Sequence, residues 1–557
     1  MTIDKNRRRT VAGLAAGTAL ALTGCAGSRQ KPPAQRFAHG VASGDPTAAS
    51  VVLWTRLSGI SGDMPVSWEI AHDRQFTHLA GRGDASALAD RDFTVKVEAD
   101  GLEPGSRYFY RFRAGSAVSP VGRTRTLPRG AVAALGFAVA SCSNYPFGYF
   151  NAYEAIALDP QVDFVLHLGD YLYEYAADGW GAERGVSLGR LHRPAGEIVT
   201  LADYRTRHAQ YKGDLQSQAL HAAHPLIPLW DDHESANNPW TGGAENHQSA
   251  TEGAWSDRRA AATRAWFEWM PVRDPEPSQA AWDYWRSFRF GDLATLVTLE
   301  TRHGARSRQI DYGDHPEALA GPEGARRFLA EVVGDPARRL LSGEQERFVS
   351  AALAASVQAG QPWRLVGNQV PMARTAAPRL SDADLASLAP VAPADELERV
   401  RRLAKRGALG LPLYLDPWDG YPAARERFYA GARAAGARDL LVLTGDSHSF
   451  WANALHDGAG DSVGLELGTT GITSPGDFAR LGRDGARLLD RRLAEGNPEV
   501  LWTDGLHNGY LRLRLTPARA QADYIAVSSV LDRAYSLSRL RRLQISREAG
   551  TLAWEWA

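Results

Sequence analysis

Residues 137–175 constrain the fold of this chain more than any other stretch. Residues 137–140 form an apolar run that ends at Ser141-Cys142-Ser143-Asn144, and residues 163–168 form a second apolar run that ends at Gly169-Asp170. A helix-like segment of about ten residues lies between them, so the stretch predicts a β-α-β unit with parallel strands. Cys142, Asp170 and Tyr173 then emerge at the carboxyl end of a sheet, where open α/β sheets bind ligands.

Four further apolar runs are also followed directly by polar residues. These endings are Asp231-Asp232-His233-Glu234, Glu300-Thr301-Arg302, Gly367-Asn368-Gln369 and Gly445-Asp446-Ser447-His448. A buried strand needs a turn after it, but it has no need of a carboxylate or an imidazole there. The six endings together therefore predict an α/β fold with one shared polar site.

The first residues of the chain predict a targeting signal rather than a folded element. Residues 5–9 are basic, residues 11–22 are apolar and small, and Gly24-Cys25 follows. The apolar run is well short of the roughly 20 residues that span a bilayer, so we expect residues 1–25 to be a lipoprotein signal peptide with Cys25 lipidated. The arginines at 7–9 favour twin-arginine export over a general secretory signal. The mature protein would be anchored at the cell envelope, on its periplasmic or extracellular face.

The length of 557 residues predicts more than one domain. After a short tether, residues 26–36, short β-rich runs separated by turn residues predict a small fibronectin-like β-sandwich over residues 37–130. Alternating strands and helices follow through residues 131–535, which we take as the catalytic domain. We expect residues 378–398 to be an irregular insertion and residues 536–557 to form a basic C-terminal helix and tail.

Composition narrows the possible partners. With 23% charged residues and a formal net charge of -1 at pH 7, the chain has no excess charge for binding nucleic acid. The chain has 2 cysteines, Cys25 and Cys142, so lipidation of the first leaves the second without a disulfide partner. A lone thiol in an oxidising compartment is either a small buried apolar side chain or a metal ligand, and its position alone leaves both open.

The polar strand endings supply the ligand types of a mixed metal site. Thiolate, phenolate and imidazole suit a redox-capable metal such as iron, whereas carboxylates and amides suit a hard divalent cation. Asp170 is the natural bridge, because one carboxylate can neutralise two cations held roughly 3.5–4 Å apart. The candidate donors are Cys142, Asp170, Tyr173, Asp232, His233, Asn237, Asn238, Asp446 and His448.

These motifs carry a family resemblance. Gly169-Asp170, Asp232-His233-Glu234 and Gly445-Asp446-Ser447-His448 resemble the motifs of the metallophosphatase superfamily. More narrowly, the sequence is similar to the PhoD-like alkaline phosphatases at residues 37–57, 141–144, 230–238 and 418–422. The resemblance implies a metallophosphatase-like αββα sandwich behind the N-terminal β-sandwich. It also implies an exported, metal-dependent phosphoric ester hydrolase that contains iron (Fe3+) and calcium (Ca2+).

The resemblance further implies roles for single residues. Ferric iron would be held by Cys142, Asp170, Tyr173 and His448, and calcium would lie near Asp170, Asp232 and Asp446. We take Asn237 as the amide ligand of calcium, with Asn238 one position away as the alternative. His233 is the candidate for protonating the leaving group and Arg302 the candidate for clamping the phosphate. The nucleophile would be a metal-bound hydroxide.

Three functions remain open from the sequence alone. Besides a phosphomonoesterase, a phosphodiesterase or phospholipase D would use the same metals in a wider cleft. A lipid-anchored binding module without catalysis would hold no metal. Small phosphate esters are the expected substrates, and contact with a membrane is expected only through the lipid anchor. Glu300 stands where the family usually carries an Asp before Arg302, so a longer carboxylate there could shift the arginine.

Overall fold

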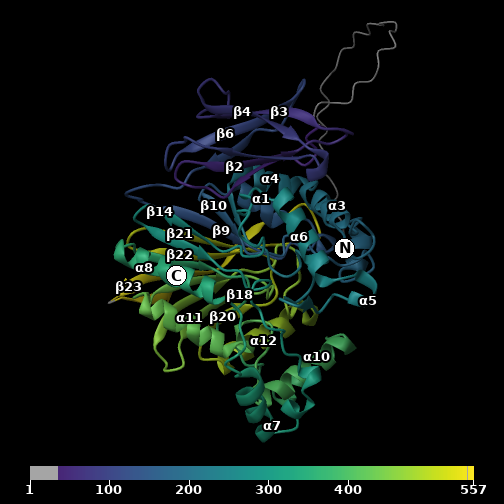
Figure 1. Cartoon of the computed structure of the whole chain (residues 1–557). Helices are drawn as coiled ribbons and strands as arrows, with labels where there is room; N and C mark the ends of the chain where they lie inside the picture. Colours follow the sequence, from purple (N-terminus) through teal and green to yellow (C-terminus); the bar gives the residue numbers. More distant parts are fainter. Residues whose placement is uncertain (1–35, 549) are drawn as a thin grey trace, which may run out of the picture.

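The computed structural model describes residues 36–548 and 550–557. The predicted signal peptide with its lipidated Cys25, and the tether up to residue 35, lie outside the described residues. Two large sheets face each other in the middle of the molecule, and helices cover their outer sides (Figure 1). A smaller β-sandwich stands at one end. The expected αββα sandwich behind an N-terminal β-sandwich is confirmed.

The first large sheet contains the predicted β-α-β unit at its centre. Strands β9 and β10 are parallel, pair Phe137 with Phe164, and are joined through α1 (Asn151–Leu158). β11 continues the parallel set. The strand order is β24 (Thr551–Trp556), β23 (Leu537–Glu548), β22 (Ala520–Val527), β21 (Gly509–Leu515), β9 (Leu135–Ala140), β10 (Phe164–His167), β11 (Leu226–Pro228), β1 (Val41–Gly44), β2 (Val51–Arg56) and β5 (Thr94–Ala99).

The second large sheet has seven strands. Its centre is parallel, since β15 pairs with β16, β16 with β17, and β17 with β19 in the same direction. The strand order is β14 (Arg286–Phe290), β15 (Ala294–Thr298), β16 (Trp363–Gly367), β17 (Leu440–Thr444), β19 (Ser462–Gly468), β18 (Phe450–His456) and β20 (Val500–Asp504).

The main core lies between the two sheets. Phe137 and Leu166 of the first sheet pack there with Leu365 and Leu441 of the second. Because successive strand residues point to opposite faces, Ala138 packs instead among the helices on the outer side. Strands covered on both faces need apolar residues at nearly every position, which is why they read as continuous apolar runs in the sequence.

The helices divide between the two outer faces. The first sheet is covered by α1, α3 (Leu201–Lys212), α4 (Leu215–Ala223) and α6 (Trp255–Trp269), and the second by α8 (Gly343–Gln358) and α11 (Pro422–Ala434). α8 starts where its capping signal predicts, with the Ser342 hydroxyl accepting from the Gln345 amide at 3.1 Å. Trp266 of α6 is buried in the core, as expected for a packing side chain.

The N-terminal sandwich shares its first sheet with the rest of the molecule. β1, β2 and β5 form one end of the ten-stranded sheet, where β1 pairs in parallel with β11 through Gly44 and Leu226. Its second sheet has five strands, β4 (Leu79–Ala87), β3 (Met64–Ala71), β6 (Arg107–Ala114), β7 (Ala117–Val118) and β8 (Gly122–Arg125). The two units are therefore joined by a continuous sheet rather than by a linker alone.

Two sequence-based expectations near the C-terminal half are wrong. Residues 536–557 form no helix: β23 and β24 pair as an antiparallel hairpin at the edge of the first sheet. The reason is a period of two, since Leu543 and Ile545 are buried while their neighbours point outward. The insertion at 378–398 is also more regular than expected, because it contains α9 (Asp382–Leu388) and the start of α10 (Ala394–Ala408).

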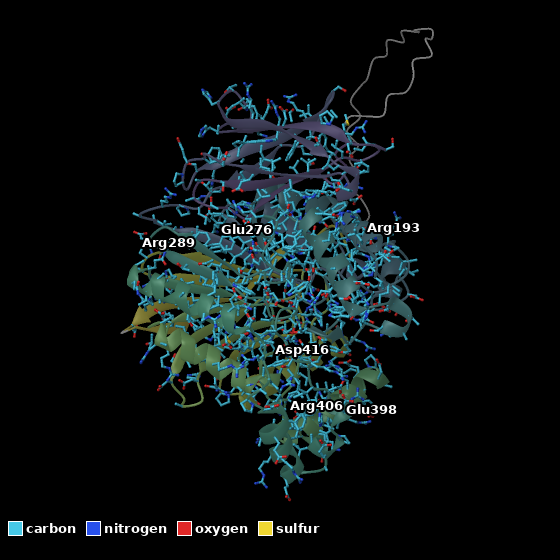
Figure 2. All side chains as sticks on the ribbon, viewed as in Figure 1. Arg193, Glu276, Arg289, Glu398, Arg406 and Asp416 are labelled. Carbon is cyan, nitrogen blue, oxygen red and sulfur yellow. The ribbon has the colours of Figure 1, made fainter. Side chains whose placement is uncertain are left out.

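Helices α7 (Pro322–Arg327) and α10 form a lobe at the end of the molecule opposite the N-terminal sandwich (Figure 1). Asp416 lies between the body of the molecule and this lobe, which carries Glu398 and Arg406 (Figure 2). Within the described ranges, none of the helices is long and apolar enough to cross a membrane.

Candidate metal centre

Loops at the carboxyl ends of four parallel strands bring the predicted donors together. Cys142 follows β9, Asp170 follows β10, Asp232 follows β11 and Asp446 follows β17. Backbone hydrogen bonds tie neighbouring loops to each other. The Cys142 amide donates to the Gly169 carbonyl at 3.2 Å, and the Ser143 amide donates to the Asp170 carbonyl at 2.9 Å. Four of the six predicted strand endings therefore lie together at one edge of the sheets.

Several of the predicted donors sit in the left-handed backbone region. Such a conformation costs a non-glycine residue roughly 1–3 kcal/mol and concentrates at functional sites. It turns each side chain out of the direction that a continuing strand would give it. The residues and their φ values are Cys142 at 60°, Asp170 at 53°, Asn238 at 50°, Asp446 at 63° and His448 at 54°.

The first group of donors surrounds Cys142. Ligand atoms of Cys142, Asp170 and His448 all lie within 4.8 Å of one another. The Tyr173 hydroxyl donates to Asp170 Oδ2 at 2.9 Å and lies 3.3 Å from His448 Nε2. The four residues to which the resemblance assigns iron are thus in contact as a group, and their donor types suit such a metal.

Burial makes this group costly to ionise without a cation. Burial, and then the charge of Asp170, hold the pKa of the Cys142 thiol well above its usual value. Burial also holds the pKa of Asp170 well above its usual value. The same burial lowers the pKa of His448 to about 4, so its ring is neutral and can act as a ligand.

Two further groups of donors have Asp232 in common. Ligand atoms of Asp170, Asp232 and His233 form one group, and those of Asp231, Asp232 and Asp446 form the other, each within 4.8 Å. Asp170 therefore belongs to this set and to the group around Cys142. A carboxylate shared in this way is the arrangement that two-metal hydrolytic sites use.

Two oxygens of this acidic set have no hydrogen-bond partner among the described residues. Both Asp231 Oδ2 and Asp232 Oδ1 are buried, and Asp232 Oδ1 lies 3.7 Å from Arg302 Nη2, beyond hydrogen-bond distance. Leaving a buried polar atom unsatisfied costs about 1–3 kcal/mol, and more for a charged group, so native proteins rarely do so without a reason. Buried carboxylate oxygens that accept no hydrogen bond fit hard cations such as calcium.

Arg302 lies inside the carboxylate cluster and is fully buried. Its Nη2 donates to Asp446 at 2.9 Å and its Nη1 donates to Asp416 at 2.8 Å. Its Nε donates to Asp231. Each of its three nitrogens is thus bonded to a carboxylate, and the charges of Asp231 and Asp416 more than offset the effect of burial on the Arg302 pKa, which rises. The geometry makes Arg302 a cross-link between three loops.

Glu300 organises the turn that carries Arg302. Its Oε1 accepts from the Arg302 and His303 amides at 2.8 and 2.7 Å, and its Oε2 accepts from the Gly304 amide at 2.8 Å. In the described part of the chain no hydrogen bond joins Glu300 to the guanidinium. The longer carboxylate therefore acts on the backbone of the turn and not directly on the arginine head.

His233 is held by an acidic partner. Its Nδ1 lies 2.7 Å from Glu174 Oε2, and its ring packs on Tyr173 with centroids 4.2 Å apart. Burial alone would lower the pKa of His233, but the charges of Asp232, Glu174 and Asp170 outweigh it and hold the pKa well above the usual value. A protonated imidazole beside the donor set is a suitable proton donor for a leaving group.

Asn238, rather than Asn237, lines the cleft beside the donors. The Asn238 amide donates to Asp232 Oδ2 at 2.9 Å, and its side chain donates to Glu245 at 2.7 Å. Asn237 lies further back, with its Oδ1 3.4 Å from the Tyr175 hydroxyl. Of the two asparagines, Asn238 is the one that lines the cleft.

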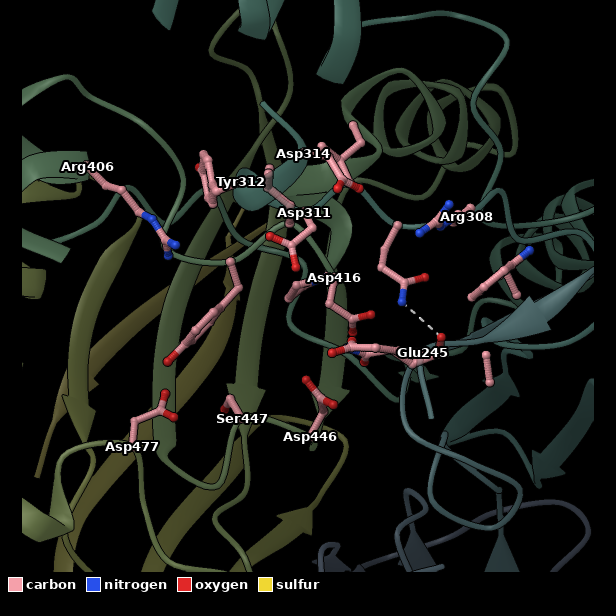
Figure 3. Close-up of a pocket in the computed structure, with 18 of the residues that line it drawn as sticks. Glu245, Arg308, Asp311, Tyr312, Asp314, Arg406, Asp416, Asp446, Ser447 and Asp477 are labelled. Carbon is pink, nitrogen blue, oxygen red and sulfur yellow. Dashed lines mark hydrogen bonds between the residues drawn. The ribbon is translucent and has the colours of Figure 1, made fainter. Parts of the chain in front are cut away.

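A cleft of about 770 Å³ opens beside these loops (Figure 3). Asp446 and Ser447 line one side of it, and Asp416 stands near its middle. Asp311 and Tyr312 lie on the opposite side, where the lobe begins. The volume is within the range of roughly 300–1,000 Å³ that is typical of small-molecule sites.

Three residues of the site were not among the predicted donors. Asp231 joins the acidic set, Asp416 receives Arg302, and Glu174 holds His233. Asp231 precedes the predicted donor Asp232, and Glu174 follows the predicted donor Tyr173. Both residues are therefore direct sequence neighbours of predicted donors. Asp416 precedes the 418–422 motif, but nothing in the local pattern connects it to an arginine more than a hundred residues away.

Comparisons with known proteins show the family to which this chain belongs. Residues 137–524 match the family described as PhoD-like phosphatase, and residues 24–128 match the PhoD-like phosphatase N-terminal domain. The chain is 35% identical over 560 residues to alkaline phosphatase D of Bacillus subtilis (strain 168), across 96% of this chain and 86% of that protein. It superposes on a solved structure of PhoD with a TM-score of 0.75 and 33% identity, across 94% of this chain and 93% of that one. The chain therefore belongs to the PhoD-like phosphatase family and is a phosphoric ester hydrolase.

Proposed function

We propose that this hydrolase depends on two kinds of metal ion, iron and calcium. The observation that carries the proposal is the sharing of Asp170 between two groups of ligand atoms. The proposed iron ligands are Cys142, Asp170, Tyr173 and His448, and the proposed calcium ligands are Asp170, Asp232, Asp446 and Asn238. Membership of a phosphatase family removes the non-catalytic binding module as an alternative.

The chemistry is divided between the cations and the residues of the chain. When bound, the cations would activate water as the nucleophile and neutralise phosphoryl oxygens during attack. His233, held by Glu174, would give a proton to the leaving oxygen. Arg302 would keep Asp231 and Asp446 in place, so that the acidic loops keep their geometry while substrate enters.

The Asp170→Asn variant tests this proposal, because it keeps the size of the side chain and removes its charge. We expect it to lose iron and calcium, and its kcat/KM for p-nitrophenyl phosphate to fall by more than about a hundredfold. The matched control is Asp314→Asn, which alters a carboxylate of the cleft outside the donor groups and should keep both properties. Near-wild-type turnover by Asp170→Asn would overturn the proposed site.

Phosphodiesters are the second candidate substrates. The volume of the cleft, about 770 Å³, leaves room for a substituent on both sides of a phosphate. Comparing kcat/KM for bis-p-nitrophenyl phosphate, p-nitrophenyl phosphate and a phospholipid distinguishes a phosphomonoesterase from a phosphodiesterase or phospholipase D. A clear preference for the diester or the phospholipid would replace the monoesterase proposal with a phosphodiesterase or phospholipase D.

Export and anchoring are proposed from residues 1–25 alone. We propose that the chain leaves the cytoplasm by the twin-arginine route and is held at the cell envelope by a lipid on Cys25. The Cys25→Ala variant should then lose its association with the membrane fraction while the enzyme stays active. Retention of that variant in the membrane fraction would contradict the lipid anchor.

A further inference from the structure

The side chain of Trp180 lies against the group of donors around Cys142, and none of the roles described above uses it. The Trp180 ring is stacked on His448, with ring centroids 5.7 Å apart and 13° between the planes. It also lies 5.8 Å from the Tyr173 ring and 4.7 Å from the Phe147 ring. The indole therefore neighbours two of the proposed iron ligands.

Trp180 keeps 38% of its surface exposed despite these contacts. A single exposed apolar side chain is ordinary on a protein surface and needs no explanation by itself. Trp180 differs because its stacking partner, His448, lines the cleft beside the donor loops. The exposed indole therefore lies next to a residue that lines the cleft.

The loop that carries Trp180 holds the indole in one place. The Ala177 amide donates to the Ala195 carbonyl at 2.7 Å, and the Ala182 amide donates to the Gly179 carbonyl at 2.9 Å. Gly181 has a φ of 95°, and a Cβ at this position would meet the Phe147 ring at 2.9 Å. A rigid aromatic side chain can bind a flat ligand at a small cost in conformational entropy.

We propose that Trp180 is a specificity-determining residue, which packs against a flat apolar leaving group of the phosphate ester held at the donor loops. The chemical class is an aryl phosphate, whose ring begins one bond beyond the ester oxygen. An aliphatic alcohol presents no flat face to the indole and gains little from it. This inference rests on the proposed function, because it needs the phosphate to be bound beside His448.

The same contacts would also serve a purely positioning role. In that case the indole keeps the His448 ring in place and never touches a substrate. Removing it would then weaken metal retention, and it would affect every phosphate ligand equally. The two roles can be separated by comparing ligands that share a phosphonate group and differ only in the flat ring.

The experiment measures binding of phenylphosphonate and methylphosphonate to the full-length, metal-loaded protein by calorimetry. Neither ligand has an ester bond to hydrolyse. The variants are Trp180→Ala and Trp180→Phe, and the control is Trp554→Ala, which alters an equally exposed indole, 39% exposed, on β24. Iron and calcium contents are measured on every sample.

We expect Trp180→Ala to raise the Kd of phenylphosphonate about fivefold to tenfold and that of methylphosphonate less than about twofold, with metal content unchanged. Trp180→Phe should keep most of the preference for phenylphosphonate over methylphosphonate, and Trp554→Ala should keep all of it. An equal change for both ligands, no change for either, or loss of metal would overturn the inference. If the wild-type protein binds neither phosphonate and hydrolyses no phosphate ester, the proposed function itself fails, together with this inference.

Discussion

At the scale of single residues, charge balance decides how the centre can work. Burial raises the pKa of Asp446 to about 7 and holds the pKa of Asp170 well above its usual value. Arg302 offsets part of the negative charge of the cluster, because it bonds to Asp231, Asp416 and Asp446. Cations at the donor groups would offset the rest, so metal binding and stability should be linked.

Arg302→Gln tests the role of the arginine as a cross-link. Removing one partner of a buried ion-pair network costs about 3–5 kcal/mol, because charged groups remain buried without compensation. We expect the free energy of unfolding of the metal-free protein to fall by that amount, and that of the metal-loaded protein to fall less. Urea unfolding with and without bound metal measures both.

The matched control for that variant is Arg401→Gln, which breaks a solvent-exposed pair with Glu398. Exposed pairs contribute about 0–1 kcal/mol, so this change should be small in both states. If Arg302→Gln leaves stability unchanged in both states and abolishes phosphate binding, Arg302 is a clamp on the substrate after all.

Most donors could be predicted at this scale because they follow apolar strands directly. Cys142, Asp170 and Asp446 stand at such ends, where a core strand has no need of them. The direction in which neighbouring side chains point could not be predicted, because it depends on left-handed turns that tertiary contacts impose. That is why Asp231 was missed and why the choice between Asn237 and Asn238 needed the structure.

At the scale of elements, the turn after β10 is the most constrained part of the site. Gly169 has a φ of 105°, and a Cβ there would lie 2.3 Å from the Asp231 amide nitrogen. Gly169→Ala should therefore destabilise the fold by more than about 2 kcal/mol, because backbone rather than a flexible side chain must move. Thermal unfolding measures the effect.

Gly189→Ala is the matched control for the turn. Gly189 has a φ of 65° with open space around its Cβ position, so only the left-handed conformation is penalised. That penalty is roughly 1–2 kcal/mol. Equal destabilisation by the two variants would show that the close approach between the β10 and β11 loops contributes nothing.

The end of α3 carries a buried lysine that faces the N-terminal sandwich. Lys212 Nζ lies 3.0 Å from His221 Nε2 and 4.8 Å from the centroid of the Trp54 ring on β2. In the described part of the chain no carboxylate lies within 4.0 Å of it, and burial holds its pKa well below the usual value. The unfolded chain therefore binds a proton that the folded chain releases.

Lys212→Met should change the pH dependence of stability. Because the unfolded state binds more protons, wild-type stability should rise as pH rises toward the ordinary lysine pKa of roughly 10.4. The variant should lack that rise and should be more stable near neutral pH by about 1 kcal/mol or more. Urea unfolding between about pH 6 and pH 9 measures both profiles.

Lys405→Met, at an exposed position of α10, is the control for that comparison and should leave the profile unchanged. Parallel pH profiles for the wild type and Lys212→Met would contradict the account of the buried amine. They would mean that the lysine keeps its proton in the folded state.

The strands of the two sheets could be predicted because burial on both faces makes them apolar throughout. The C-terminal hairpin could not, because its outward positions are basic and only Leu543 and Ile545 mark the inward face. Arg542 of β23 bonds to Asp523 of β22, a contact that only the folded sheet creates. The sequence of a short amphipathic segment of this kind is compatible with either a helix or a strand, and only the partner strand decides between them.

At the scale of the whole molecule, the four layers follow from the alternation of strands and helices, but the joining of the two units does not. The pairing of Gly44 with Leu226 links segments far apart in the chain, and no local pattern signals it. The consequence is a sheet that runs from the N-terminal sandwich to the C-terminal hairpin. The loops that carry Cys142, Asp170 and Asp232 stand on this sheet, and the loop that carries Asp446 stands on the second sheet, which packs against it.

We propose that the loops on these two sheets form a metal-dependent hydrolytic centre. The most direct test is elemental analysis of the purified full-length protein, combined with chelation and re-addition of iron and calcium while hydrolysis of p-nitrophenyl phosphate is measured. We expect stoichiometric iron and calcium, loss of activity when both metals are removed, and recovery when they are returned. Full activity in a protein stripped of both metals would contradict it.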